Sequence, residues 1–75
     1  MSPKLPRVSA VDILRALHRD GWFDSHQRGS HLYLRHPTKP GKVTVPKHRG
    51  DLQPATINSI LKQAGLTIDE LRRLL

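Results

Sequence analysis

Residues 31–36 read His-Leu-Tyr-Leu-Arg-His, an alternation of side chains that is typical of a β-strand. Successive side chains of a strand point to opposite faces of its sheet. Leu32 and Leu34 therefore share one face, which is expected to pack against the core. The opposite face of this strand carries His31, Tyr33 and Arg35. The pattern thus predicts a sheet with one buried face and one polar face.

Two further strands are expected, one on each side of this segment. Residues 22–28 form the first, and Gly29 then predicts a tight turn into the next strand. Trp22 and Phe23 are expected to help to fill the core. Residues 42–46 form the third strand, with its two valines facing inward. Three sequential strands joined by short turns predict an antiparallel sheet.

Apolar residues at helical spacing predict three helices around this sheet. The first covers residues 10–20, with Ser9 as its N-cap. The second covers residues 54–64 and starts with a proline, which suits the first turn of a helix. The segment Thr67-x-x-Glu70 has the pattern of a capping box and predicts a short last helix.

The order of helix, three strands, helix and short helix predicts an α+β fold. Helices at both ends of the chain most simply cover one face of the three-stranded antiparallel sheet and leave the other open. This α-β-β-β-α order is the one used by double-stranded-RNA-binding domains. At this length, residues 9–75 are expected to form a single domain. Residues 1–8, with two prolines and two cations, are expected to be a flexible N-terminal arm.

The most biased stretch of the chain runs from Asp24 to Asp51, because no acidic residue lies between them. The cations inside it are Arg28, Arg35, Lys39, Lys42, Lys47 and Arg49. The whole chain has 13 Lys+Arg against 6 Asp+Glu, a formal net charge of +7. Such an excess attracts polyanions, so nucleic acid is the leading partner. A membrane is not expected, because the cations do not lie along one apolar-backed helix.

The chain has no cysteine, which excludes a disulfide framework, Cys-ligated zinc and thiol catalysis. This composition fits a cytoplasmic protein. The acid-free stretch holds four of the five histidines: His26, His31, His36 and His48. A metal site made from the first three is not expected, because the segment contains no carboxylate and its charge is positive. No cofactor is expected either.

Histidine is the side chain best suited to moving protons near neutral pH. RNA cleavage without a metal needs such proton transfers, because the 2′-hydroxyl is the nucleophile and the 5′-oxygen must leave. His31 is the candidate, although from the residues alone a solvated strand histidine is the commoner role. His48 is a second candidate, as the partner of His31 in an acid–base pair, but its favoured role is to anchor its loop or bind phosphate. Ser30 is not expected to act as a nucleophile, because it points away from the face of His31.

The residues expected to bind RNA lie on the polar face and in the basic loops. They are Arg28, Gly29, Ser30, Tyr33, Arg35, Lys42, Lys47, His48 and Arg49. Phosphate contacts by the cations should make the affinity for RNA fall steeply with salt. Gly29 lets a phosphate backbone approach closely. Tyr33 either stacks on a base or shields the sheet.

Four segments make the chain resemble the HicA family, the toxin component of bacterial toxin–antitoxin pairs. They are Gly21-Trp22, Gly29-Ser30-His31, Val45-Pro46-Lys47-His48 and residues 60–66, Ile-Leu-Lys-Gln-Ala-Gly-Leu. The segments occur in the family's order and at its spacing. The chain departs from the pattern at Leu32, where the family often has a second histidine, and at Trp22, where it usually has Phe.

The resemblance implies a ribonuclease that cuts messenger RNA, with His31 as its catalytic residue, and that is neutralised by a HicB-type antitoxin. A non-catalytic module that binds double-stranded RNA is the alternative. A DNA-binding domain that uses the helix at 54–64 is a weaker one, because that helix offers few side chains for bases. Any carboxylate that orients His31 must come from outside the acid-free stretch, and Asp24 and Asp51 at its borders are the first candidates.

Overall fold

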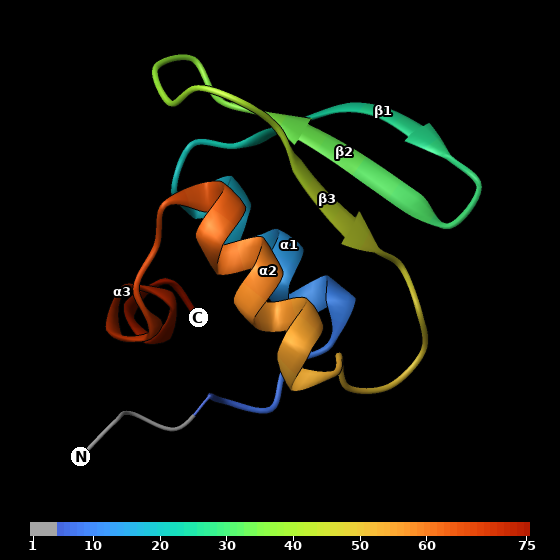
Figure 1. The fold of residues 1–75 in the computed structure, drawn as a ribbon, viewed down its shortest axis with the longest axis vertical. Coiled ribbons are helices and arrows are strands. Elements are labelled where there is room, and N and C mark those ends of the chain that lie inside the picture. The colour runs from blue at the N-terminus through green and yellow to red at the C-terminus, as the bar shows by residue number, and fades with distance from the viewer. Residues whose placement is uncertain (1–4) are drawn as a thin grey trace.

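The computed structural model describes residues 5–75 and has the predicted order of elements (Figure 1). The elements are α1 (Ala10–Arg19), β1 (Phe23–Arg28), β2 (His31–Arg35), β3 (Val43–Pro46), α2 (Pro54–Ala64) and α3 (Ile68–Leu74). The three strands form one antiparallel sheet in the order β1-β2-β3. The α+β fold expected from the sequence is therefore confirmed.

The helices begin at the residues whose side chains satisfy their first amides. The Ser9 hydroxyl accepts from the Asp12 N–H at 3.2 Å, and the Asp12 carboxylate accepts from the Ser9 N–H at 3.1 Å. Thr67 and Glu70 form the same reciprocal pair at the start of α3, at 3.1 and 3.0 Å. Both capping boxes stabilise the first turn of their helix. The helix α2 lacks a side-chain cap and begins instead with Pro54.

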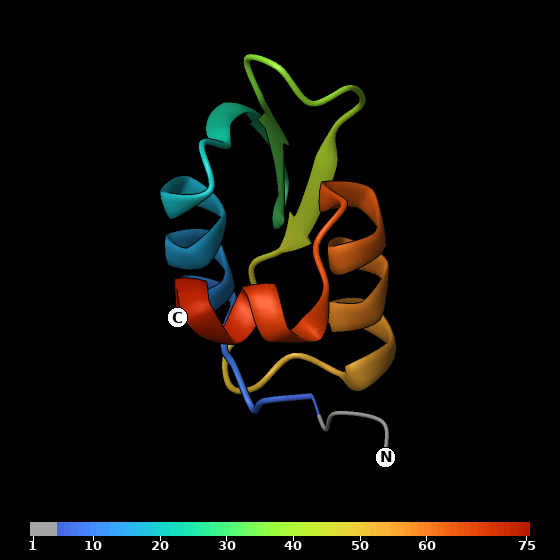
Figure 2. The same ribbon diagram turned by 90° about the vertical axis from the view of Figure 1, so that its left-hand side faces the viewer.

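The core lies between the inner face of the sheet and the helices. Its fully buried side chains from β2, β3, α1 and α2 include Leu34, Val43, Val45, Ile13, Leu17, Ile57 and Ile60. Figure 2 shows α1 and α2 on either side of the lower part of the strands, with α3 running across from α2 toward α1. Leu71 of α3 is also buried in this cluster. The inward alternation predicted for β2 and β3 is confirmed.

Trp22 and Phe23 have opposite environments. Trp22 is 2% exposed, whereas Phe23 is 50% exposed, so the expectation that Phe23 fills the core is wrong. Phe23 pairs with Arg35 of β2 and therefore lies on the face away from the core. The reason is the alternation of extended backbone, since adjacent side chains cannot both point inward.

The residues just before α1 pack against the domain. Val8 is 3% exposed, and its carbonyl accepts from the Leu52 N–H at 2.8 Å. Ser9 and Asp51 form an isolated antiparallel bridge beside this bond. Leu5 packs against the core cluster as well. The flexible arm expected over residues 1–8 thus does not extend to Val8, and residues 1–4 lie outside the described residues.

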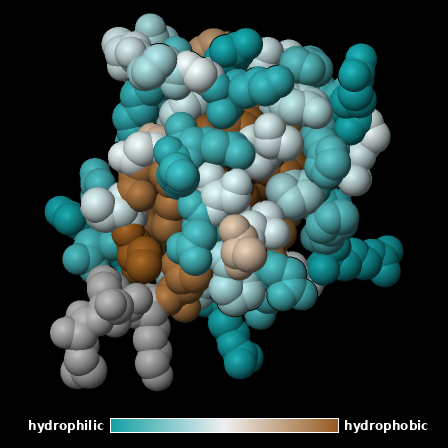
Figure 3. Space-filling view, viewed as in Figure 1, coloured by the Kyte–Doolittle hydropathy of each residue, from teal (hydrophilic) through white to brown (hydrophobic). Residues whose placement is uncertain are grey.

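Hydrophilic side chains cover most of the face seen in Figure 3, with an apolar area at its lower left beside the grey residues. Across residues 5–75, no helix is both long enough and apolar enough to cross a membrane.

Candidate active site and nucleic-acid interface

The strand register arranges the outward side chains of the sheet in rows. Residues opposite one another in an antiparallel pair lie on the same face. The face turned away from the core, called the open face below, carries Phe23, His26, Arg28, His31, Tyr33, Arg35, Thr44 and Pro46. One row is Arg28–His31–Pro46, and the next is His26–Tyr33–Thr44. None of these side chains is a carboxylate, so the sheet contributes no negative charge to this face.

His31 is the first residue of β2 and is exposed. It lies opposite Arg28 on one side and Pro46 on the other. Within residues 5–75 its imidazole has no hydrogen-bond or ion-pair partner. Both ring nitrogens are therefore without a partner among the described residues.

The turn before His31 connects it to the basic loop. Gly29 has φ +59°, and an added Cβ would have no heavy atom within 4 Å, so the space above it is open. The Ser30 carbonyl accepts from the Lys47 N–H at 2.7 Å, which extends the pairing of β2 and β3 by one residue. Lys47 and the two residues that follow it, His48 and Arg49, are exposed. The turn and the loop thus bring the predicted phosphate-binding groups to the same end of the sheet.

Tyr33 is held between two other side chains. The His26 ring stacks on it with centroids 4.5 Å apart and an interplanar angle of 11°. The Lys42 ammonium lies over the Tyr33 ring, 4.9 Å from its centroid. Since His26 comes from the β1 side of β2 and Lys42 from the β3 side, they cover opposite faces of the ring. Tyr33 is therefore a fixed part of the surface, and both of its faces are occupied.

The two border carboxylates do not contact His31. Asp24 lies opposite Leu34, on the inner side of β1, and its Oδ1 is 2.8 Å from His18 Nε2 of α1. Asp51 pairs through its backbone with Ser9. Neither carboxylate hydrogen-bonds His31 within the described part of the chain. His31 therefore has no orienting carboxylate from these two residues.

Two other cations of the acid-free stretch make intramolecular contacts. The Lys39 ammonium is 2.6 Å from Asp20 Oδ2 and 3.2 Å from the Ala64 carbonyl, so it joins the ends of α1 and α2. Lys39 therefore has partners within the domain, and its expected contact with phosphate stays a prediction. Arg35 donates to the Gly41 carbonyl at 3.2 Å and remains exposed on the open face.

His36 has a structural role that the sequence did not reveal. Its Nδ1 accepts from the N–H groups of Thr38 and Lys39, each at 3.1 Å, so the ring proton lies on Nε2. Nε2 donates to the Asp20 carbonyl at 2.8 Å. The ring also meets Trp22 edge-on, with centroids 5.2 Å apart. His36 thereby fastens the loop after β2 to the end of α1.

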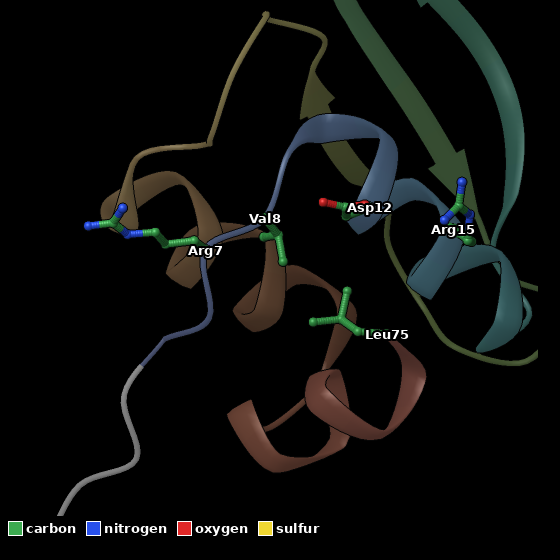
Figure 4. A pocket seen from close by; sticks show the side chains of 5 residues that line it. All are labelled: Arg7, Val8, Asp12, Arg15 and Leu75. Carbon is green, nitrogen blue, oxygen red and sulfur yellow. The ribbon is translucent and has the colours of Figure 1, made fainter.

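The surface hollows differ in their position relative to this face. A groove of about 360 Å³ borders it, between Thr44 and Pro46 of β3 and residues of α2 that include Ser59 and Gln63. Another hollow, of about 240 Å³, is lined by Arg7, Val8, Asp12, Arg15 and Leu75, none of which belongs to the sheet (Figure 4). Among residues 5–75, no group of three or more His, Cys, Asp or Glu side chains could hold a metal ion.

A family model described as the HicA toxin of bacterial toxin–antitoxin systems matches residues 10–66. The chain belongs to the HicA toxin family. The match spans α1, the whole sheet and α2, and it contains Gly29-Ser30-His31 and the basic loop. Membership in the HicA family gives the chain the role of the toxin in a toxin–antitoxin pair. No curated protein matches the chain significantly.

Proposed function

We propose that this HicA-family toxin is a metal-independent endoribonuclease that cuts messenger RNA, with His31 as its catalytic acid or base. The observation that carries the proposal is the position of His31. It is exposed on an open face whose side chains include no carboxylate, opposite Arg28. The proposal is supported by an imidazole and a guanidinium lying opposite one another on the same face of the sheet.

The chemistry requires a proton to leave the 2′-hydroxyl and another to reach the 5′-oxygen. An imidazole transfers protons efficiently when its pKa lies near the working pH, as the ordinary histidine value of about 6.5 does. Arg28, directly across the strand pair, can stabilise the charge that builds on the phosphorane. Lys47, joined through its N–H to Ser30, supports the adjacent phosphates.

The antitoxin partner follows from the family, and we propose that it is of the HicB type. The same open face would serve the toxin in both states, holding RNA when free and covered by the antitoxin when inhibited. Co-purification from the native operon tests this pairing. Recovery of the toxin with no such partner would contradict it.

The activity is tested by incubating a long transcript with the purified toxin in the presence and absence of a chelator. We expect cleavage in both conditions and a loss of about 10²–10⁴-fold in rate for His31→Ala. The matched control is His18→Ala, which removes a histidine from outside the open face. Full activity of folded His31→Ala would refute its catalytic role, and binding without cleavage by the parent would favour the non-catalytic double-stranded-RNA module.

A further inference from the structure

Three side chains of the open face pack in a row that ends at the His26 ring, one face of which is uncovered. Lys42, Tyr33 and His26 lie in line across the sheet, from the β3 side to β1. β1 is one of the two edge strands of the sheet, and every one of its residues is exposed. The face of His26 that is turned away from Tyr33 has no ring contact within residues 5–75. The row therefore offers one unoccupied stacking face, on His26.

This surface is made of side chains that pack on one another, and it lies close to His31. Tyr33 fixes the His26 ring from behind, and Lys42 fixes Tyr33 from the other side. His26 and His31 are diagonal neighbours on the open face, since their partners are Tyr33 and Arg28. Diagonal neighbours on one sheet face lie about 7–8 Å apart. A nucleotide whose phosphate is at His31 can thus place an adjacent base at His26.

We propose that one unpaired base of the RNA substrate stacks on the free face of His26, so that the toxin acts on single-stranded RNA. This inference rests on the proposed ribonuclease function and assigns its substrate class. Only an unpaired base can present its flat face to a protein ring, because bases within a duplex are stacked on one another. The charge of the open face also suits a polyanion, because its strand residues include Arg28 and Arg35 and no carboxylate, and Lys42 lies over Tyr33.

Tyr33 does not contact the base itself in this arrangement. Because both of its ring faces are occupied, Tyr33 supports the platform and His26 provides the contact. Phe23 lies on the same face of β1 and is half-exposed, so it offers a second aromatic surface along the edge strand.

The test measures binding and does not depend on cleavage. The parent is His31→Ala, and its affinity for a short fluorescent oligoribonucleotide is measured at fixed salt. Adding His26→Ala should weaken binding by about 5- to 150-fold, the range for one stacked base. Adding His26→Phe should keep the affinity within about threefold, because it preserves the ring. Adding His18→Ala, the matched control, should leave the affinity unchanged.

A scan of abasic positions identifies the base. One position should weaken the parent about as much as His26→Ala does, and should have no further effect once His26 is alanine. An equal loss in His26→Phe and His26→Ala would overturn the proposal, since a ring would then not suffice. Unchanged affinity in His26→Ala would overturn it too, as would an equal loss for duplex RNA.

The two proposals can fail separately. If His31→Ala still cleaves RNA, the catalytic assignment fails while the binding series still reports on stacking. If His26→Ala binds RNA normally but escapes inhibition by the antitoxin, the free face of His26 is a contact for the antitoxin. The stacking proposal is then wrong.

Discussion

Gly21 lies against the ring of His36 so closely that a Cβ on Gly21 would be 2.7 Å from Nε2. That nitrogen donates to the carbonyl of the preceding residue, Asp20. The left-handed backbone of Gly21, with φ +104°, lets the chain leave α1 and pass beneath the imidazole. The glycine and the histidine together fix where the sheet attaches to the first helix.

Gly21→Ala should therefore lower the free energy of unfolding by about 2–3 kcal/mol, because it adds backbone strain and displaces His36. Urea denaturation measures the loss. The control is Gly41→Ala, where φ is +78° but an added Cβ meets open space, and about 1 kcal/mol is expected. Equal losses of unfolding free energy in the two variants would mean that displacing the His36 ring does not destabilise the fold.

Lys39 and Lys42 lie three residues apart and should give opposite results. Lys39→Met breaks the contacts with Asp20 and the Ala64 carbonyl, so stability should fall by about 1 kcal/mol with little change in RNA affinity. Lys42→Met should leave stability almost unchanged and weaken RNA binding. The slope of log affinity against log salt should also decrease in magnitude by about 0.7 for Lys42→Met, as for one lost phosphate contact to a single strand. Similar RNA affinities for the two variants would contradict the distinction.

Trp22→Ala and Phe23→Ala test the two sides of the chain where it enters β1. Removing the buried indole should lower the free energy of unfolding by about 3–5 kcal/mol. Removing the half-exposed phenyl ring should lower it by about 1 kcal/mol or less, because much of its surface already meets water. Thermal melts of both variants measure this difference. A large loss for Phe23→Ala would show that the ring packs in solution.

The capping boxes should make the fold sensitive to acid. Two hydrogen bonds from Ser9 lower the pKa of Asp12 below its ordinary 3.8, and the bond from the Ser9 backbone N–H has the larger effect. Those from Thr67, again with the larger effect from the backbone N–H, lower the pKa of Glu70 below 4.5. A lowered pKa means that the folded state binds the proton less readily than the unfolded chain. The stabilisation is therefore complete above these ordinary values and is lost as pH falls through the lowered ones.

The measurement is the melting temperature from pH 6 to pH 2. In the double variant Asp12→Asn, Glu70→Gln, the caps no longer titrate, so the fall in melting temperature below pH 4.5 should be shallower than in the parent. Asp51→Asn, which changes an exposed carboxylate outside both caps, should keep the parent's slope. Parallel curves for parent and double variant would exclude the caps as the source of acid sensitivity.

Local patterns were enough to predict the elements of the fold. The capping residues Ser9 and Thr67 act on amides within one helical turn, and the alternation of Leu32 and Leu34 depends only on the pleat of one strand. The prediction for Phe23 was wrong because Trp22 and Phe23 are adjacent in extended backbone, so only one of the two side chains can face the core.

The features that the sequence did not predict depend on contacts between residues far apart in the chain. Lys39 meets partners 19 and 25 residues away, and His36 meets one 16 residues away. No local signal separates these side chains from the solvated cations and histidines beside them. The stacking of His26 on Tyr33 also required the register, since a bulge between Asp24 and His26 shifts the pairing of β1. His31 and its exposure followed from strand alternation, but its lack of a carboxylate partner did not.

The bridge between Ser9 and Asp51, with the hydrogen bond from Leu52 to Val8, has a consequence for synthesis. The basic loop, residues 47–51, is fixed at one end by the hydrogen bond to Ser30 and at the other by this bridge. The bridge joins two parts of the chain that the ribosome makes at well-separated times. A chain interrupted before residue 52 would contain Gly29-Ser30-His31 without the means to hold Lys47, His48 and Arg49 near it. Prematurely terminated products of this toxin gene should therefore carry the motif but be harmless.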